Sequence, residues 1–336
     1  MVIFNLFDRA NLFFFEENRG KMASFTFSFE LNTNENDGDC AVAGSKSTND
    51  ENTSLLPLFQ VPCPPWVASP SFDPPRVELE FTSANRIKNA QTFRLKKIDV
   101  DQHPKTLSSF NVPTNHDIVP RRYEGGYKLW ECSLDLVQFL LDESDIIKGK
   151  SQIPEKMNVL ELGCGHGLPG AAAVALFSPE RAVFSDLNEE VLKDTTWANI
   201  RLNGGTNISG RSSSSAVDCI AGDWHFLSSW FASQELSFDI ILSAETLYNV
   251  ENCVVLAKLL YSSLSLNGVA FLATKRYYFG VGGGTETAIK AIEDNNESYR
   301  SPLGSQNKRL ACDIVRRFED GASNIRDIIA VKWLTY

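Results

Sequence analysis

The sequence predicts an α/β fold in which a mostly parallel, seven-stranded sheet ends in a C-terminal antiparallel hairpin and follows an irregular N-terminal extension. From residue 123 onward, apolar segments of strand length alternate with segments of helical periodicity, which is typical of a parallel sheet with helices on both faces. A glycine-rich turn follows the first strand, as in the first β–turn–α unit of nucleotide-binding sheets. The last two strands are joined by the short segment 320–324, which leaves no room for a crossover helix, so they should pair antiparallel.

The individual elements follow from hydrophobic periodicity. A helical apolar face between Leu129 and Leu141 precedes the first strand. The predicted strands are 157–162, 181–186, 216–221, 237–242, 267–274, 310–317 and 325–334. The predicted helices between them lie near 168–177, 188–200, 250–264 and 285–294.

Composition divides the chain into three parts. They are a largely disordered N-terminal segment at 1–55, an N-terminal extension with short strands at 56–122, and the α/β domain at 123–336. We expect disorder in the first part because 32–54 is polar and nearly free of large apolar side chains. In the proline-rich extension only 77–81 and 92–98 have the character of strands. The polar insertion at 203–215 is expected to be a mobile surface loop.

Charge and cysteine content limit the functions open to the chain. The formal net charge of −10 gives an acidic surface, which does not suit generic binding to nucleic acid. The seven cysteines are odd in number and include no C-x-x-C pair, so we expect a reducing compartment and no structural zinc. The four histidines lie at no metal-ligand spacing, so no metal is expected. No apolar run reaches the length of a membrane span, and we expect no membrane partner.

The run VLELGCGHGLPG at 159–170 places glycines directly after the first strand. Gly163 and Gly165 let a ligand approach the backbone and permit the positive φ that a tight turn demands. Gly165 also begins a G-x-G-x-x-G pattern, so a dinucleotide-binding loop is a real alternative. Glu161 favours a different ligand, because a carboxylate would repel a pyrophosphate but not a sulfonium with a cationic amino-acid tail. The E-x-G-x-G-x-G pattern and the closing hairpin resemble the S-adenosylmethionine loop and the layout of Rossmann-like class I methyltransferases.

Acidic and aromatic residues follow the second and third strands. Asp186 ends the second strand, where a carboxylate accepts hydrogen bonds from ribose hydroxyls in both competing folds. The alternative is that Asp186 and Asn188 cap the next helix. After the third strand, Asp223 can pair with an adenine amine and Trp224 offers a flat face to the base. A turn with a core tryptophan would give the same pattern.

Polar residues also follow the fourth strand. Ligands of open α/β sheets lie beyond the carboxyl ends of the strands, so Ser243, Glu245, Tyr248 and Asn249 are candidate site residues. The alternative is a helix N-terminus with Asn249 as its cap.

Two further segments are candidates for the walls of a site. Glu131 and Ser133, at a predicted helix start, could hold the amino-acid part of a ligand, or they could cap the helix. The loop 275–284 after the fifth strand combines glycines with tyrosines, and it could either shape a substrate pocket or serve as a flexible turn.

Four motifs, in this order and spacing, resemble those of the eukaryotic protein-histidine methyltransferases, a class I family. They are YEGGYKLWECSLDL, VLELGCGHGLPG, FDIILSAETLYN and KRYYFGVGGG. The resemblance covers roughly residues 120–335. It implies S-adenosylmethionine as the cofactor and a histidine of a large-subunit ribosomal protein as the substrate. It also implies a monomer found in cytoplasm and nucleus. His166 and Pro169 in the glycine loop depart from the family pattern.

The candidate residues are expected to have three roles. Glu245 and Asn249 are expected to be catalytic, and Tyr248, Tyr278 and Gly282 to bind the substrate. The expected cofactor-binding residues are Leu129, Trp130, Glu131, Cys132, Ser133, Glu161, Gly163, Gly165, Asp186, Asn188, Gly222, Asp223, Trp224 and Ser243.

The chemistry of methyl transfer fits a histidine acceptor. An imidazole with a pKa of about 6.5 offers a neutral nitrogen at pH 7, whereas a lysine with a pKa of about 10.4 must first lose a proton. Glu245 could hold the reactive tautomer and offset the positive charge that develops. Three alternatives stay open: methylation of lysine or a small molecule by the same fold, an NAD-dependent oxidoreductase, and a degenerate fold that only binds. The acidic residues at each expected site position argue against degeneracy.

Overall fold

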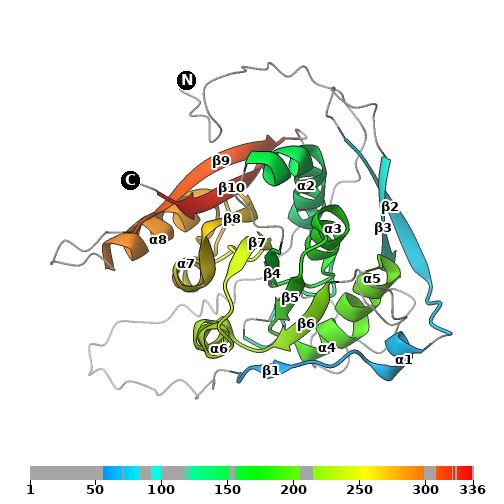
Figure 1. Ribbon diagram of the computed structural model, residues 1–336. Coiled ribbons are helices and arrows are strands. Elements are labelled where there is room, and N and C mark those ends of the chain that lie inside the picture. Colours follow the sequence, from blue (N-terminus) through cyan, green and yellow to red (C-terminus); the bar gives the residue numbers. More distant parts are fainter. Residues whose placement is uncertain are drawn as a thin grey trace, which may run out of the picture.

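The computed structural model describes most of the chain from residue 56 onward. The described residues are 56–69, 71–83, 92–99, 118–119, 121–150, 156–204, 215–298, 308–319, 321 and 324–334. The expectations for 1–55, 102–117 and 205–214 concern residues outside this set. The described chain forms one large sheet flanked by helices, with a separate two-stranded sheet beside it (Figure 1).

The large sheet has the predicted, mostly parallel topology. Its strands in chain order after the extension are β4 (Asn158–Leu162), β5 (Arg181–Asp186), β6 (Ala216–Ala221), β7 (Phe238–Ala244), β8 (Leu264–Lys275), β9 (Leu310–Phe318) and β10 (Arg326–Trp333). Their spatial order is β6-β5-β4-β7-β8-β10-β9, and β4 to β8 pair in parallel. β10 lies antiparallel between β8 and β9, which confirms the C-terminal antiparallel hairpin.

The N-terminal extension adds an eighth strand that the sequence does not predict. β1 (Phe59–Gln60) pairs antiparallel with the outer edge of β6. The next residue, Val61, is fully buried; its N–H donates to the Cys219 carbonyl at 2.7 Å and its carbonyl accepts from Trp197 Nε1 at 3.0 Å. The expectation of irregular chain was wrong here, because a strand of two residues shows no alternation that periodicity could detect. The four-residue helix α1 (Pro65–Ala68) was missed for the same reason.

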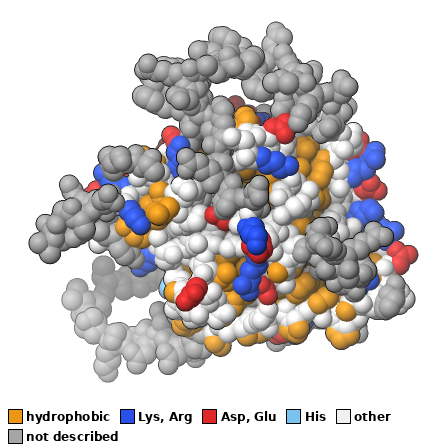
Figure 2. All heavy atoms as spheres, in the orientation of Figure 1, with side chains coloured by type: hydrophobic (Ala, Val, Ile, Leu, Met, Phe, Trp, Pro, Cys, Tyr) orange, Lys and Arg blue, Asp and Glu red, His pale blue; other side chains and the backbone are white. Residues whose placement is uncertain are grey.

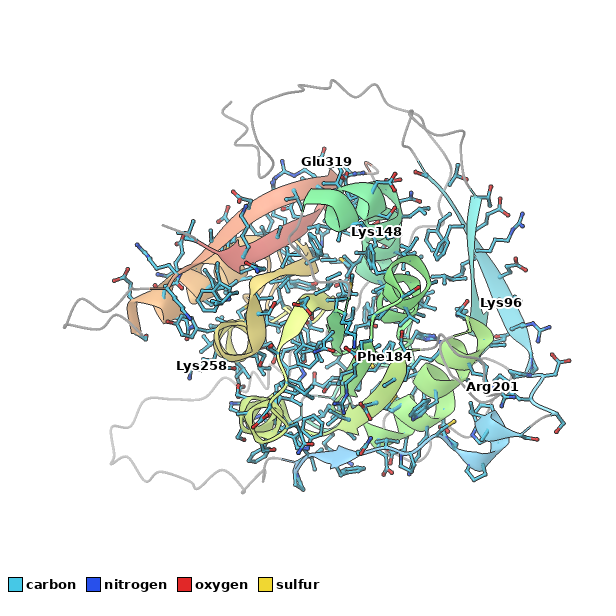
Figure 3. The ribbon with its side chains drawn as sticks, in the orientation of Figure 1. Lys96, Lys148, Phe184, Arg201, Lys258 and Glu319 are labelled. Carbon is cyan, nitrogen blue, oxygen red and sulfur yellow. The ribbon has the colours of Figure 1, made fainter. Side chains whose placement is uncertain are left out.

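The two short strands predicted in the extension are confirmed. β2 (Arg76–Thr82) and β3 (Thr92–Ile98) form an antiparallel pair, and Phe81 and Leu95 pack against helices of the domain. The amide of Asn199 accepts from the Ile98 N–H at 2.7 Å, so a side chain satisfies backbone that the hairpin leaves unpaired. Figure 3 shows Lys96 of β3 and Arg201 of the adjoining helix on neighbouring elements.

Helices cover both faces of the large sheet, as the alternating pattern predicts. They are α2 (Glu131–Lys150), α3 (Leu168–Phe177), α4 (Glu189–Val191), a π-helical turn (Leu192–Thr196), α5 (Trp197–Leu202), α6 (Leu227–Ser233), α7 (Val250–Ser263) and α8 (Thr285–Ser298). Val159 of β4 packs towards α2 and α3, whereas Leu160 packs in the core beneath α6, α7 and α8. The period-two alternation of strand side chains therefore builds two cores, one on each face (Figure 1).

One helix of the domain was missed by the sequence. The link between β6 and β7 contains a 3₁₀ turn (Trp224–Phe226) followed by α6. In α6 only Leu227 and Phe231 are buried, and one i, i+4 pair gives too little periodicity to detect. Within the described chain, we find no helix with the length and apolar character needed to cross a membrane.

We predict that Gly170 in α3 cannot be replaced by alanine without a loss of stability. A Cβ there would lie 2.4 Å from the Phe184 ring and 2.6 Å from Glu161 Oε2. We expect Gly170→Ala to lower the free energy of unfolding by about 1–3 kcal/mol, because overpacking outweighs the gain in helix propensity. In α2, a Cβ at Gly149 meets no atom within 4 Å, so Gly149→Ala should instead stabilise by about 0.5 kcal/mol. Urea denaturation of both variants measures the difference, and equal effects would contradict it.

Candidate active site

A cleft lies beyond the carboxyl ends of β4, β5, β6 and β7. Its walls come from the segment before α2, from the glycine turn after β4, and from the turns after the other three strands. It holds about 1110 Å³ of space, part of it open to solvent. Open α/β sheets bind their ligands in such a cleft, beyond the carboxyl ends of the strands.

The glycine turn at the base of the cleft depends on the absence of side chains. Gly163 and Gly165 have φ values of +61° and +49°, which favour glycine. A Cβ at Gly163 would lie 2.5 Å from Thr246 Cγ2, and one at Gly165 would lie 3.1 Å from the Gly126 carbonyl oxygen. The bare backbone of this turn therefore runs between the segment before α2 and the turn after β7.

Asp186 holds the glycine turn from the end of β5. Its Oδ2 accepts the N–H of Gly165 at 2.9 Å, and its Oδ1 accepts the N–H of Asn188 at 3.1 Å. Burial raises the pKa of the Asp186 carboxyl, while these backbone hydrogen bonds oppose the rise. Asn188 lies off the cleft wall, where its amide donates to the Arg122 carbonyl at 2.7 Å and fastens the segment before α2.

Glu161 lies beneath the glycine turn rather than on the cleft wall. Its Oε2 accepts the N–H of Gly170 at 2.8 Å, at the start of α3. Burial raises the pKa of Glu161 to about 8. In this structure the side chain orders the turn and the helix start, and its expected contact with a cofactor stays a prediction.

The turn after β6 forms another wall and joins the cleft to the extension. Asp223 Oδ1 accepts the N–H of His225 at 2.9 Å and lies 2.6 Å from His225 Nδ1. Trp224 stands beside the glycine turn, 3.4 Å from the position of a Cβ on Gly163. Gly222 packs against the extension, since a Cβ there would lie 2.5 Å from the Pro57 carbonyl oxygen.

Glu245 follows β7 with a left-handed backbone, φ +57°. Its side chain is only 2% exposed and lies 3.3 Å from Lys275 Nζ. Tyr278 donates its hydroxyl proton to Glu245 Oε2 at 2.5 Å. Glu131 is the second carboxylate beside Lys275, at 3.5 Å. Burial alone would lower the pKa of Lys275, but Glu245 and its neighbours outweigh burial and raise it.

The glycine-rich loop after β8 supports the turn after β7. The N–H of Gly283 donates to the Tyr248 carbonyl at 3.1 Å, and Gly282 forms an isolated β-bridge with Asn249. A Cβ at Gly283 would lie 2.2 Å from the Leu247 carbonyl oxygen, so the close approach requires glycine. Asn249 also caps α7, because its Oδ1 accepts the N–H of Asn252 at 2.8 Å.

The structure brings twelve of the expected residues to the cleft wall and leaves seven behind it. On the wall are Leu129, Trp130, Ser133, Gly163, Gly165, Asp186, Gly222, Asp223, Trp224, Glu245, Tyr248 and Asn249. Behind it are Glu131, Cys132, Glu161, Asn188, Ser243, Tyr278 and Gly282, each of which contacts or adjoins a wall segment. Ser243, for example, donates to the Leu162 carbonyl at 3.0 Å below the floor.

Thirteen of the 25 wall residues were not among the expected site residues, and Glu124 and His166 are two of them. Glu124 accepts the N–H of Arg121 at 2.6 Å and the hydroxyl proton of Tyr248. His166 Nε2 lies 2.8 Å from the Tyr127 carbonyl oxygen, and burial lowers the pKa of His166 to about 4, so the ring is neutral at pH 7. Glu124 belongs to the YEGGY segment, but a loop residue without a capping or strand-end position carries no signal for a site.

Comparison with known proteins identifies the family. A family model described as lysine methyltransferase matches residues 121–280. The chain is 38% identical over 215 residues to the histidine protein methyltransferase 1 homolog of Dictyostelium discoideum, covering 64% of this chain and 60% of that protein. It is 30% identical over 246 residues to histidine protein methyltransferase 1 of Schizosaccharomyces pombe, covering 62% and 68%. The chain belongs to the histidine protein methyltransferase 1 family.

The matches to members of this family leave part of each relative uncovered. The chain spans 60% of the length of the Dictyostelium homolog and 54% of the Bos taurus homolog, to which it is 32% identical over 57% of its own length. A solved structure described as a putative sam-dependent methyltransferase from Streptococcus mutans aligns with 61% of this chain and 49% of that chain, at 16% identity and a TM-score of 0.43. Activity and substrate therefore have to be inferred from the site.

The cleft fits S-adenosylmethionine, the cofactor of the family. Its wall carries five carboxylates and two cationic side chains, and the guanidinium of Arg121 is already paired with Glu251 at 2.9 Å. This excess of negative charge stabilises a sulfonium and an ammonium and would repel a pyrophosphate. Each oxygen of Asp186 accepts one of the backbone hydrogen bonds above, and a carboxylate has about four acceptor sites, so ribose hydroxyls can still bind.

We predict that Asp186→Ala weakens the binding of S-adenosylhomocysteine. Hydrogen bonds to a charged group contribute roughly 1.5–3 kcal/mol, which corresponds to a loss of about tenfold or more in affinity. Calorimetric titration measures the change, and the melting temperature without ligand separates it from unfolding. An unchanged affinity would show that Asp186 serves only the backbone of Gly165 and Asn188.

We also predict that Glu245 stabilises the fold through Lys275. Breaking a buried ion pair costs about 3–5 kcal/mol when one charge is left alone. Because Glu131 still faces Lys275, we expect Glu245→Gln to lower the free energy of unfolding by less than that, about 1–3 kcal/mol. Glu131→Gln removes the more distant and more exposed partner and should have a smaller effect. Equal stability of wild type and Glu245→Gln in urea would contradict this role.

Proposed function

We propose that this protein methylates the imidazole of a histidine residue in a protein substrate. The observation that carries the proposal is the carboxylate-rich cleft in a chain of the histidine protein methyltransferase 1 family. When bound, S-adenosylmethionine supplies an electrophilic methyl group on a sulfonium. The wall residues of the glycine turn, Asp186, Asp223 and Trp224 are the groups that would hold it. Methyl transfer then needs mainly a neutral, well-oriented nucleophile.

The charge of the cleft favours histidine over lysine as the acceptor. A lysine ammonium has a pKa of about 10.4, and surrounding carboxylates raise that pKa further, away from the neutral amine that can attack. An imidazole with a pKa of about 6.5 remains partly neutral at pH 7 even beside anions. Lysine methylation is the second candidate, because the matching family model carries that description.

Glu245 and Asn249 serve this reaction as positioning groups in our proposal. Lys275 compensates the charge of Glu245, and the Tyr278 hydroxyl donates a hydrogen bond to it. Asn249 caps α7. Together they fix the turn that presents Tyr248 and Thr246 to the cleft. Glu245 Oε1 accepts no hydrogen bond within the described residues, but it is buried and lies 3.3 Å from the Lys275 ammonium, which compensates its charge.

A large-subunit ribosomal protein is the substrate that we propose, on the basis of the family resemblance. Ribosomal proteins are basic, and the net charge of −10 would attract them. On the face shown in Figure 2, where grey atoms do not cover it, Lys and Arg lie interspersed with Asp and Glu and form no continuous basic patch. We further propose that the protein acts as a monomer, in cytoplasm and nucleus.

Transfer of label tests the proposed function. The protein is incubated with methyl-labelled S-adenosylmethionine and fractionated ribosomal proteins, and the labelled product is hydrolysed to amino acids. We expect the label in methylhistidine and a strong reduction with Asp186→Ala. Label in methyl-lysine would instead support the second candidate, and the absence of label in protein would contradict both.

A further inference from the structure

The two glutamates of the cleft differ in their charge compensation. Glu245 lies 3.3 Å from Lys275. Glu124 has no cationic partner in the described part of the chain: its two recorded hydrogen bonds come from the backbone N–H of Arg121 and the hydroxyl of Tyr248. The guanidinium of Arg121 turns instead to Glu251, at 2.9 Å.

The charged groups that face Glu124 are otherwise anionic. They are Asp186 at the end of β5, Asp223 after β6 and Glu251 on α7. Burial first, and then these carboxylates, raise the pKa of Glu124 to about 7, although the Arg121 N–H opposes the rise. An uncompensated carboxylate in such a place gains stability from any cation that forms beside it.

We infer that Glu124 accepts the N–H of the substrate imidazole and takes its proton after methyl transfer, and that Tyr248 positions the carboxylate. The inference rests on the proposed function. The lone pair of the attacking ring nitrogen forms a bond to the methyl carbon. The S–C bond of the donor breaks at the same time, and the electron pair of that bond stays on sulfur. The ring thereby becomes an imidazolium, the proton on its other nitrogen passes to Glu124, and Glu124 releases that proton to solvent. Neutral methylhistidine remains.

The contacts of the two glutamates assign this step to Glu124 rather than Glu245. The Glu245 side chain is 2% exposed, and its oxygens face Tyr278 and Lys275. Each oxygen of Glu124 receives one donor and keeps acceptor capacity towards the cleft. The rings of Tyr248 and Tyr278 lie 6.5 Å apart, and their hydroxyls donate to different glutamates, so each acid has its own positioning tyrosine.

The basicity of Glu124 also matches the proton that it would receive. An imidazolium has a pKa of about 6.5. A general base acts most effectively when its pKa lies near the pH at which the enzyme works. A carboxylate at its ordinary pKa of about 4.3 would be a much weaker base than Glu124, whose pKa is about 7.

The test compares E124Q, Y248F and the charge-matched control E251Q by kcat as a function of pH. Each variant is assayed with a saturating concentration of a histidine-containing substrate protein. We expect E124Q to lower kcat by about 100-fold or more and to lose the part of the limb near pH 7 that Glu124 contributes, while any part from the substrate imidazole remains. Y248F removes a donor to the charged carboxylate, so the limb should move to higher pH. E251Q should keep the limb, including any part that the substrate imidazole contributes, but move the Glu124 part to lower pH, because Glu251 is one of the carboxylates that raise the pKa of Glu124. Affinity for S-adenosylhomocysteine should be unchanged in E124Q.

Several outcomes would overturn the inference. E124Q could retain wild-type kcat and limb, or it could lose affinity for S-adenosylhomocysteine in proportion to activity, which would make Glu124 a cofactor ligand. A readout without substrate separates this failure from failure of the proposed function. Because the folded state holds the Glu124 proton up to about pH 7, ionisation destabilises wild type as pH rises from about 4.5 to 7. The melting temperature of E124Q minus that of wild type should therefore be larger at pH 8 than at pH 4.5. Equal differences at both pH values would also refute it.

Discussion

The cleft depends on one steric constraint, which is that the chain leaving β4 must cross its neighbours as bare backbone. A Cβ on Gly163 would clash with Thr246, and one on Gly165 would crowd the Gly126 carbonyl at a residue whose positive φ already favours glycine. The carbonyl of Gly165 accepts a hydrogen bond from the Thr196 hydroxyl at 2.6 Å, and the N–H of Gly165 donates to Asp186. Thr196 ends the π-helical turn, a rare irregularity that often accompanies functional sites. The glycine turn thus sets the position of every other wall of the cleft.

Electrostatics gives this scaffold its chemical character. Glu161, Asp186 and Glu124 are carboxylates whose pKa values are all raised, chiefly by burial. A positively charged ligand bound among these groups would favour their charged forms and so be stabilised by them. Three cationic side chains are held by other carboxylates: Arg121 on the wall pairs with Glu251, Lys275 lies behind the wall with Glu245, and Arg326 pairs with Asp135 at 2.5 Å and joins β10 to α2. The charge needed to balance the cleft is therefore left to cofactor and substrate.

The sequence predicts elements where a pattern repeats and misses them where burial depends on distant contacts. The strands of the main sheet and the closing hairpin follow from alternation and link length, whereas β1, α1 and α6 are too short to repeat. Position after a strand identifies Asp186 and Asp223 as wall residues. It fails for Glu161, which lies within β4 and turns towards α3, and for Glu124, whose hydroxyl donor Tyr248 lies far along the chain.

The central claim is that the cleft selects a cationic methyl donor rather than a dinucleotide. Thermal melting with S-adenosylhomocysteine and with NAD tests it directly, because a ligand that binds only the folded state raises stability. At a 100-fold excess over Kd the gain is about 2.7 kcal/mol. The account predicts a rise in melting temperature with S-adenosylhomocysteine and none with NAD. A rise with NAD alone would contradict it.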